Sequence, residues 1–114
     1  MATYTKQFLS ASTSGQPVTI ASTASASATA IHLGPTGTSL AEVWLWASAS
    51  GATTPYLNIQ KGAATSGATI SIPITPGNPQ LVLPGTLIGG GQTISAWSNV
   101  GSVIIVDGYS NLIS

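Results

Sequence analysis

The stretch EVWLWAS, residues 42–48, decides the fold of this chain. Its even-numbered positions include Trp44 and Trp46, and its odd-numbered positions are Val, Leu and Ala. Successive side chains of a β-strand point to opposite faces of a sheet, so this pattern predicts a strand that is apolar on both faces. We therefore expect both faces of this strand to be covered by other structure.

Short segments with strand-like patterns follow one another along the rest of the chain. They lie at residues 3–9, 18–22, 28–33, 55–61, 69–74, 80–83, 93–98 and 102–109. Turn-forming residues separate them, and the segment at 80–83 is expected to end at Pro84 and Gly85. This pattern predicts an all-β chain, a single-domain antiparallel β-sandwich or jelly-roll-like barrel.

Three segments allow finer expectations. Pro73 cannot donate to a sheet ladder, so residues 69–74 are expected at a sheet edge, with their three isoleucines facing inward. The run VIIV at residues 103–106 is apolar on both faces and predicts a central strand. The segments 93–98 and 102–109 flank a short Asn-Val-Gly turn, which predicts a hairpin.

The first 16 residues are expected to form an extended N-terminal arm and spacer, and residues 17–114 the β-sandwich domain. The part rich in Ser, Thr and Gly that precedes Pro17 has the composition of a flexible spacer. Tyr4, Phe8 and Leu9 give the arm apolar side chains that can add a strand to a neighbouring molecule or anchor on it.

Charge is nearly absent from this chain. Only Lys6, Glu42, Lys61 and Asp107 are charged among 114 residues, whereas a typical soluble domain is about 25% charged. Because charge keeps free globular proteins apart, this composition predicts a subunit that packs in an assembly rather than a free enzyme. Two basic side chains are too few to follow a phosphate backbone, so we expect no nucleic-acid partner.

Other classes are excluded by what the sequence lacks. There is no cysteine, so disulfides and thiolate metal sites are excluded. No apolar stretch approaches the roughly 20 residues of a membrane helix, so we expect no membrane partner. The first ten residues contain no apolar signal-peptide core, so we expect no secretory signal.

Candidate catalytic groups are few. His32, Asp107 and a serine could form a hydrolytic triad, but no nucleophile-elbow motif accompanies them. Glu42 and Asp107 could form a glycosidase pair, although each acid is better explained by pairing with a lysine or capping a turn. Zinc and calcium ligands are scarce, and the glycines at 89–91 lack the Lys and Ser or Thr of a phosphate loop. We expect a non-enzymatic protein with no catalytic residue, cofactor or metal.

The three tryptophans carry the binding hypotheses. Trp44 and Trp46 share a strand face, and Trp97 could lie on a neighbouring strand. Coplanar tryptophans can stack on sugar rings, whereas tryptophan in general is enriched in cores and protein interfaces. We favour the interpretation that the tryptophans are anchors buried either in the core or in a subunit interface. A platform that binds glycans is the alternative.

Four segments resemble the small β-rich capsid decoration (cement) proteins of tailed bacteriophages. They are PVTIAS (17–22), TAIHLGPTGTSLAEVWLWASAS (29–50), QLVLPGTLIGGGQTISAWS (80–98) and VIIVDGYSNLIS (103–114). The resemblance covers roughly residues 17–114 and lies in the residue composition of these segments and their order along the chain. It implies a β-sandwich or jelly-roll subunit that oligomerises, often as a trimer, on the outer capsid surface and clamps neighbouring capsid proteins. The family has no chemical motif, so no site residue is carried over.

We therefore expect a virion structural protein, synthesised in the host cytoplasm, that binds the major capsid protein and its own copies, with a trimer favoured. The expected interface residues are Tyr4, Phe8, Leu9, Trp44, Trp46 and Trp97. The alternative is a phage fibre, spike or lectin-like module that binds host-surface glycans. A third hypothesis, a hydrolase, predicts an activity that depends on His32.

Overall fold

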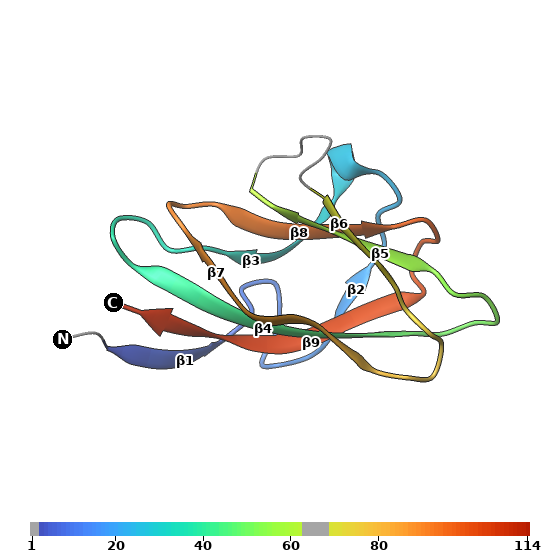
Figure 1. Cartoon of the computed structure of the whole chain (residues 1–114), viewed down its shortest axis with the longest axis horizontal. Coiled ribbons are helices and arrows are strands. Elements are labelled where there is room, and N and C mark those ends of the chain that lie inside the picture. Colours follow the sequence, from blue (N-terminus) through green and yellow to red (C-terminus); the bar gives the residue numbers. More distant parts are fainter. Residues whose placement is uncertain (1–2, 63–68) are drawn as a thin grey trace.

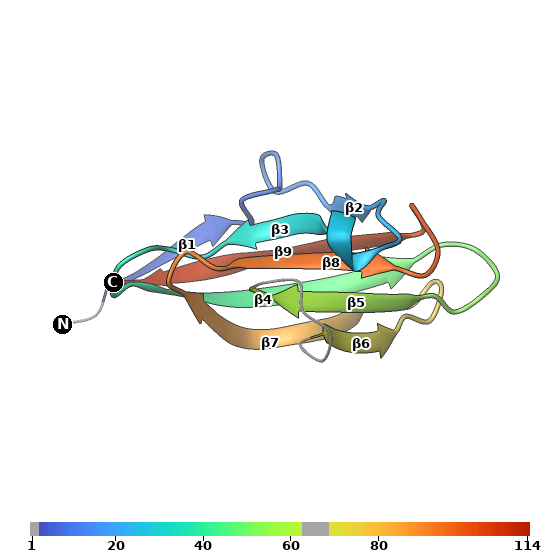
Figure 2. The ribbon, with the colours of Figure 1, turned by 90° about the horizontal axis from the view of Figure 1, so that it is seen from above.

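The computed structural model describes residues 3–62 and 69–114, which fold into two antiparallel β-sheets packed face to face (Figure 1 and Figure 2). The strands are β1 (Tyr4–Phe8), β2 (Val18–Ile20), β3 (Thr29–Leu33), β4 (Leu40–Ala49), β5 (Tyr56–Lys61), β6 (Thr69–Pro73), β7 (Gln80–Gly89), β8 (Thr93–Ser98) and β9 (Ile104–Ile113). Within the described residues, the only helical element is the single 3₁₀ turn η1 (Ser25–Ser27). The predicted all-β, single-domain sandwich is confirmed.

Each sheet pairs strands from the first half of the chain with strands from the second half. The five-stranded sheet has the order β1-β9-β4-β7, with β2 also beside β9, and the four-stranded sheet has the order β3-β8-β5-β6. The pairs β2–β9, β3–β8, β4–β7 and β5–β6 fold the chain back on itself around the β5–β6 connection. Because β2 to β5 also alternate between the sheets, we interpret this order as jelly-roll wrapping.

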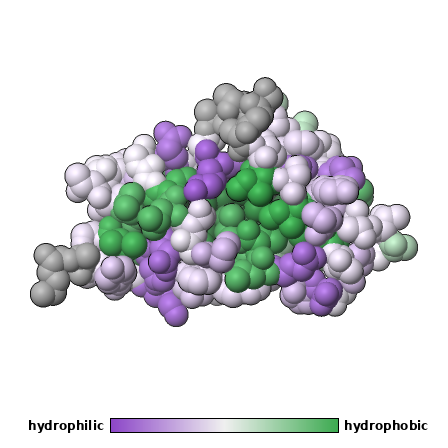
Figure 3. All heavy atoms as spheres, in the orientation of Figure 1, coloured by the Kyte–Doolittle hydropathy of each residue, from purple (hydrophilic) through white to green (hydrophobic). Residues whose placement is uncertain are grey.

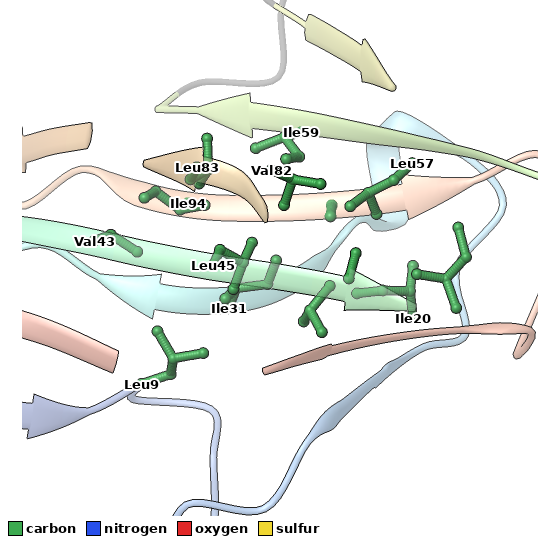
Figure 4. Packing of buried hydrophobic residues seen from close by; sticks show 14 of the residues in the cluster. Leu9, Ile20, Ile31, Val43, Leu45, Leu57, Ile59, Val82, Leu83 and Ile94 are labelled. Atoms are coloured by element: carbon green, nitrogen blue, oxygen red, sulfur yellow. The ribbon is translucent and has the colours of Figure 1, made fainter. Parts of the chain in front are cut away.

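The core lies between the two sheets (Figure 4). Val43, Leu45 and Ala47 of β4 point into it and are at most 1% exposed, as the alternation at residues 42–48 predicts. Leu57 and Ile59 of β5 meet them from the other sheet and are fully buried. Each buried Leu or Ile contributes about 1.5–3 kcal/mol through removal of apolar surface from water, which makes this layer the main source of stability.

The N-terminal segment is part of the sandwich, which corrects the expected division at residue 16. β1 pairs with β9 along its whole length, and Leu9 is 1% exposed in the core. The following residues are fixed to β3, because the backbone N–H of Ala11 donates to the carbonyl of Ile31 at 3.1 Å. Burial of Leu9 and these backbone bonds hold the segment in place, despite its spacer-like composition. Residues 1 and 2 of the expected arm lie outside the described residues.

The C-terminal strands also differ from expectation. β8 lies in the four-stranded sheet and β9 in the five-stranded sheet, so they do not form the predicted hairpin. Both strands have a buried inner face, and each face contributes to the common core from its own sheet, so the strands do not pair edge to edge. The run VIIV at 103–106 does enter a central strand, because β9 lies between β4 and the β1–β2 edge.

Two edge strands show how proline is accommodated. β6 lies at the edge of its sheet, as Pro73 predicts, but Ile70 is 44% exposed and only Ile74 is fully buried. β7 continues through Pro84 and Gly85 instead of ending there. This is possible because β7 is an edge strand and its register shifts beside Trp44, where a bulge absorbs the extra residue.

Candidate interaction surface on the five-stranded sheet

The outer face of the five-stranded sheet carries a row of aromatic side chains that crosses three strands and ends at a proline of the fourth. The register places Phe8 of β1 opposite Tyr109 of β9, Tyr109 opposite Trp44 of β4, and Trp44 opposite Pro84 of β7. Trp46 follows Trp44 two residues later on the same face, and Leu81 of β7 lies opposite it. Sequence pattern and strand register together therefore bring these side chains to one surface.

Trp44, Trp46 and Tyr109 form what we call the three-ring cluster. The ring centroids are 6.4 Å apart for Trp44 and Trp46, 6.5 Å for Trp44 and Tyr109, and 6.3 Å for Trp46 and Tyr109, with interplanar angles of 23°, 17° and 30°. A column of three stacked rings would separate its outer members by about twice the spacing of neighbours, so these near-equal distances exclude a column. The near-parallel rings form a triangle that spreads over the sheet.

Polar groups hold this cluster in place. The indole Nε1–H of Trp44 donates to Glu42 Oε1 at 2.8 Å, and the Asn111 side-chain amide donates to the same oxygen at 3.1 Å. These two bonds favour the charged form of the Glu42 carboxyl and so lower its pKa from the usual 4.5. The bond from Trp44 makes the larger contribution. Glu42 is therefore an anionic clamp on the orientation of Trp44.

Lys6 and Asp107 complete the charged residues of this face. The Lys6 ammonium lies over the Tyr109 ring, 4.6 Å from its centroid, a cation–π contact of about 0.5–1 kcal/mol at an exposed site. Asp107 lies opposite Trp46 and accepts a 2.9 Å hydrogen bond from the N–H of Gly108. Three of the four charged residues of the chain thus share one face, and two of them contact the three-ring cluster.

Two glycines make room for Trp44. A methyl group at Gly85 would come within 3.1 Å of the Trp44 ring, and Gly85 also has a φ of 76°, which disfavours other residues. A methyl group at Gly108 would collide with the backbone carbonyl of Trp44. Close approach of β7 and β9 to this tryptophan therefore requires glycine at both positions.

A hollow of about 500 Å³ opens beside the cluster. Lys6 and Phe8 of β1, Tyr109 of β9, and Gly15 from the loop after β1 contribute to its lining. It joins an aromatic surface to a cation, and so has the composition of a small-ligand site at the edge of the cluster.

The expected interface residues do not all meet here. Tyr4 and Phe8 lie on this face and are 69% and 63% exposed, whereas Leu9 is part of the core. Trp97 belongs to β8 in the other sheet, where its indole Nε1 is buried without a hydrogen-bond partner among the described residues. The predicted neighbourhood of Trp97 and the Trp44–Trp46 pair is therefore wrong.

Tyr109 and Asn111 were missed by sequence reasoning, which ended this strand at residue 109. The signal was present in the continued alternation of Ile105, Asp107, Tyr109, Asn111 and Ile113, all on one face of β9. Gly108 interrupted the apolar pattern, and pairing of β9 with β4 could be identified only from the structure.

The candidate catalytic groups are not brought together. His32 is 5% exposed in the four-stranded sheet and its Nδ1 accepts the backbone N–H of Ser10 at 3.1 Å, while Asp107 lies on the outer face of the other sheet. Burial lowers the pKa of His32 from its usual 6.5, which favours the neutral ring that this bond requires. Glu42 and Asp107 lie two rows apart, about 13 Å along the strands, beyond the separation that glycosidase pairs use.

The described part of the chain shows neither a metal-binding cluster nor a membrane-spanning helix. Residues 3–62 and 69–114 contain no group of three or more His, Asp or Glu side chains placed to hold a metal ion. Over the same ranges, no helix has the length and apolar character needed to cross a membrane. Comparison with known proteins adds no assignment, because no family model, no curated protein and no solved structure matches this chain.

Proposed function

We propose that this chain is a non-enzymatic virion structural protein, a capsid decoration subunit that binds the outer surface of a capsid lattice and stabilises the head. The observation that carries the proposal is the outer face of the five-stranded sheet. Phe8, Trp46, Leu81 and Leu87 are 37–63% exposed on it, on a chain whose surface is otherwise nearly free of charge. An apolar patch of this kind marks a protein contact site.

The arrangement of charge supports the same conclusion. Lys6 and Glu42 are directed at Tyr109 and Trp44, so they orient the aromatic surface instead of surrounding the molecule with a repelling field. Surface aromatics that are held in one conformation lose little side-chain entropy on binding, which favours their use as interface anchors. Contacts that are modest for one subunit add up when many subunits cover a lattice.

Figure 3 shows apolar areas on the side of the sandwich where β6 and β7 form the edges of the two sheets. Leu81 and Leu87 of β7 and Ile70 of β6 are each 44–50% exposed. Jelly-roll sandwiches are also common among viral capsid proteins, and this fold-level analogy supports a structural role in a virion.

Sedimentation with capsids that lack the protein tests the proposal. Wild-type protein is expected to pellet with these capsids, and Leu81→Lys is expected to lose most of this binding because it buries a charge in the contact. Val100→Lys is the matched control, since Val100 is 39% exposed in the turn after β8, away from this face. Equal binding of Leu81→Lys and wild type would contradict the proposed face, and no wild-type binding would contradict the function.

A glycan-binding module is the second candidate, and the three-ring cluster with its adjoining hollow favours it. Near-parallel aromatic rings can contact the apolar face of sugar rings, while the Lys6 ammonium offers donors to hydroxyl groups. On a glycan array, this candidate predicts binding that Trp46→Ala abolishes and that Trp97→Ala, in the other sheet, retains. An array on which wild-type protein binds nothing would argue against it.

A further inference from the structure

The outer edge of β1 has backbone groups available for pairing. Thr3 and Ser114 exchange two backbone hydrogen bonds, N–H to carbonyl at 2.8 and 3.0 Å. In an antiparallel ladder, bonded pairs alternate with non-bonded pairs, so Thr5 and Gln7 also face β9. The N–H and carbonyl groups of Tyr4, Lys6 and Phe8 therefore point away from the sheet, along an edge where all five residues of β1 are exposed.

The other edges of the two sheets are obstructed. Along β3, Ser10 and Ala11 already bond to this edge. The N–H of Leu33 donates to Ser10 Oγ at 2.7 Å, and the N–H of Ala11 donates to the carbonyl of Ile31. β6 contains Pro73. These features are the ones by which proteins prevent edge-to-edge association.

The remaining edge strands are obstructed in other ways. β7 contains Pro84 and two register shifts, and β2 is three residues long and follows Pro17. Among the described strands, β1 alone is a regular edge of five residues without proline or bulge. Its lysine does not guard the edge, because the Lys6 ammonium lies over the Tyr109 ring on the sheet face.

We infer that β1 pairs antiparallel with β1 of a second copy of this chain, forming a two-fold symmetric dimer with one continuous sheet. The inference goes beyond the proposed function, which concerns only the capsid lattice, and it specifies a dimer rather than the trimer implied by the family resemblance. A two-fold axis perpendicular to the sheet places both outer faces on the same side, so one dimer presents two three-ring clusters to one lattice.

Charge and strand length select the register of this pairing. Centring the axis on Lys6 would place the two lysines directly opposite each other, which is destabilising. Centring it on Gln7 leaves only residues 6–8 to pair, since the chain turns into the core at Leu9. Centring it on Thr5 pairs residues 3–7 of both copies and places Lys6 opposite Tyr4 of the second copy, so that the two lysines do not face each other.

Light scattering across a dilution series tests the dimer on the isolated protein, so its failure is distinguishable from failure to bind capsids. At the highest concentrations we expect a mass twice the 11.3 kDa of one chain, falling toward one chain on dilution. Lys6→Pro removes an outward N–H and no bond to β9, so it is expected to remain a monomer with unchanged circular dichroism. Lys6→Gln keeps the N–H and is expected to dimerise.

The inference is overturned if wild-type protein keeps the mass of one chain throughout, if it is a trimer at all concentrations, or if Lys6→Pro dimerises like wild type. Amide hydrogen exchange gives a readout that needs no variant. As the dimer forms, exchange at the Tyr4 and Lys6 amides should slow while Phe8 stays fast. Slow exchange at Lys6 and Phe8 with fast Tyr4 would overturn the proposed register, and no slowing at Tyr4 or Lys6 would overturn edge pairing.

Discussion

Trp44 is the residue on which the candidate surface depends. It contacts Trp46 and Tyr109 through its ring, Glu42 through its indole N–H, and the glycine at position 85 through the approach of β7. A tryptophan on an outer sheet face is costly unless something covers it, and here neighbouring side chains cover it only in part. Single substitutions around Trp44 should therefore report on the surface as a whole.

Gly85→Ala should destabilise the protein more than Gly77→Ala does. Both glycines have a φ of 76°, so both substitutions carry the same backbone strain of about 1–2 kcal/mol. Nothing lies within 4 Å of a methyl group at Gly77, whereas at Gly85 it would meet the Trp44 ring at 3.1 Å. We expect a further loss of about 1–3 kcal/mol for Gly85→Ala, measured by denaturant unfolding. Equal losses would show that the ring moves aside freely.

The pH dependence of Glu42 provides a second test. Its carboxyl pKa is lowered in the folded state, so its contribution to stability is present above the unfolded value of 4.5 and is lost as pH falls through the lower, folded pKa. Trp44→Phe removes the stronger of its two hydrogen bonds and should move this pKa back toward 4.5. Carboxyl chemical shifts followed over an acid titration measure the change, and an unchanged pKa in Trp44→Phe would contradict the clamp.

At the scale of elements, the sequence could predict that β1 is a strand but not where this strand lies in the fold. Alternation at residues 3–9 predicted a strand, and a strand is present. Its docking depends on the burial of Leu9 and on pairing with residues 109–113, a contact between the two ends of the chain that no local pattern reveals. The same limit explains the tryptophans, because strand alternation determines a face but does not determine which sheet a strand joins.

Leu9→Ala tests whether β1 is an integral part of the fold. Removing a fully buried leucine side chain is expected to reduce the free energy of unfolding by about 2–5 kcal/mol. Leu33→Ala is the matched control, because Leu33 is 58% exposed on β3 and should change stability by no more than about 0.5 kcal/mol. A separable arm would instead make both substitutions nearly neutral in a thermal melt.

At the scale of the whole molecule, the distribution of charge connects fold and function. Lys61 of β5 donates to Thr86 Oγ1 of β7 at 2.7 Å, and the other three charged residues lie on the outer face of the five-stranded sheet. Most of the remaining surface is built from small polar residues, which repel neighbours weakly. Such a molecule is suited to close packing, with one face distinguished by aromatic rings.

The central claim is that this face, rather than the four-stranded sheet, contacts the capsid. Hydroxyl-radical footprinting with mass spectrometry, on free and capsid-bound protein, tests it most directly. We predict that oxidation of Trp46 and Tyr109 falls on binding while oxidation of Trp97 in β8 is unchanged. Protection of Trp97 with unchanged Trp46 and Tyr109 would contradict the account.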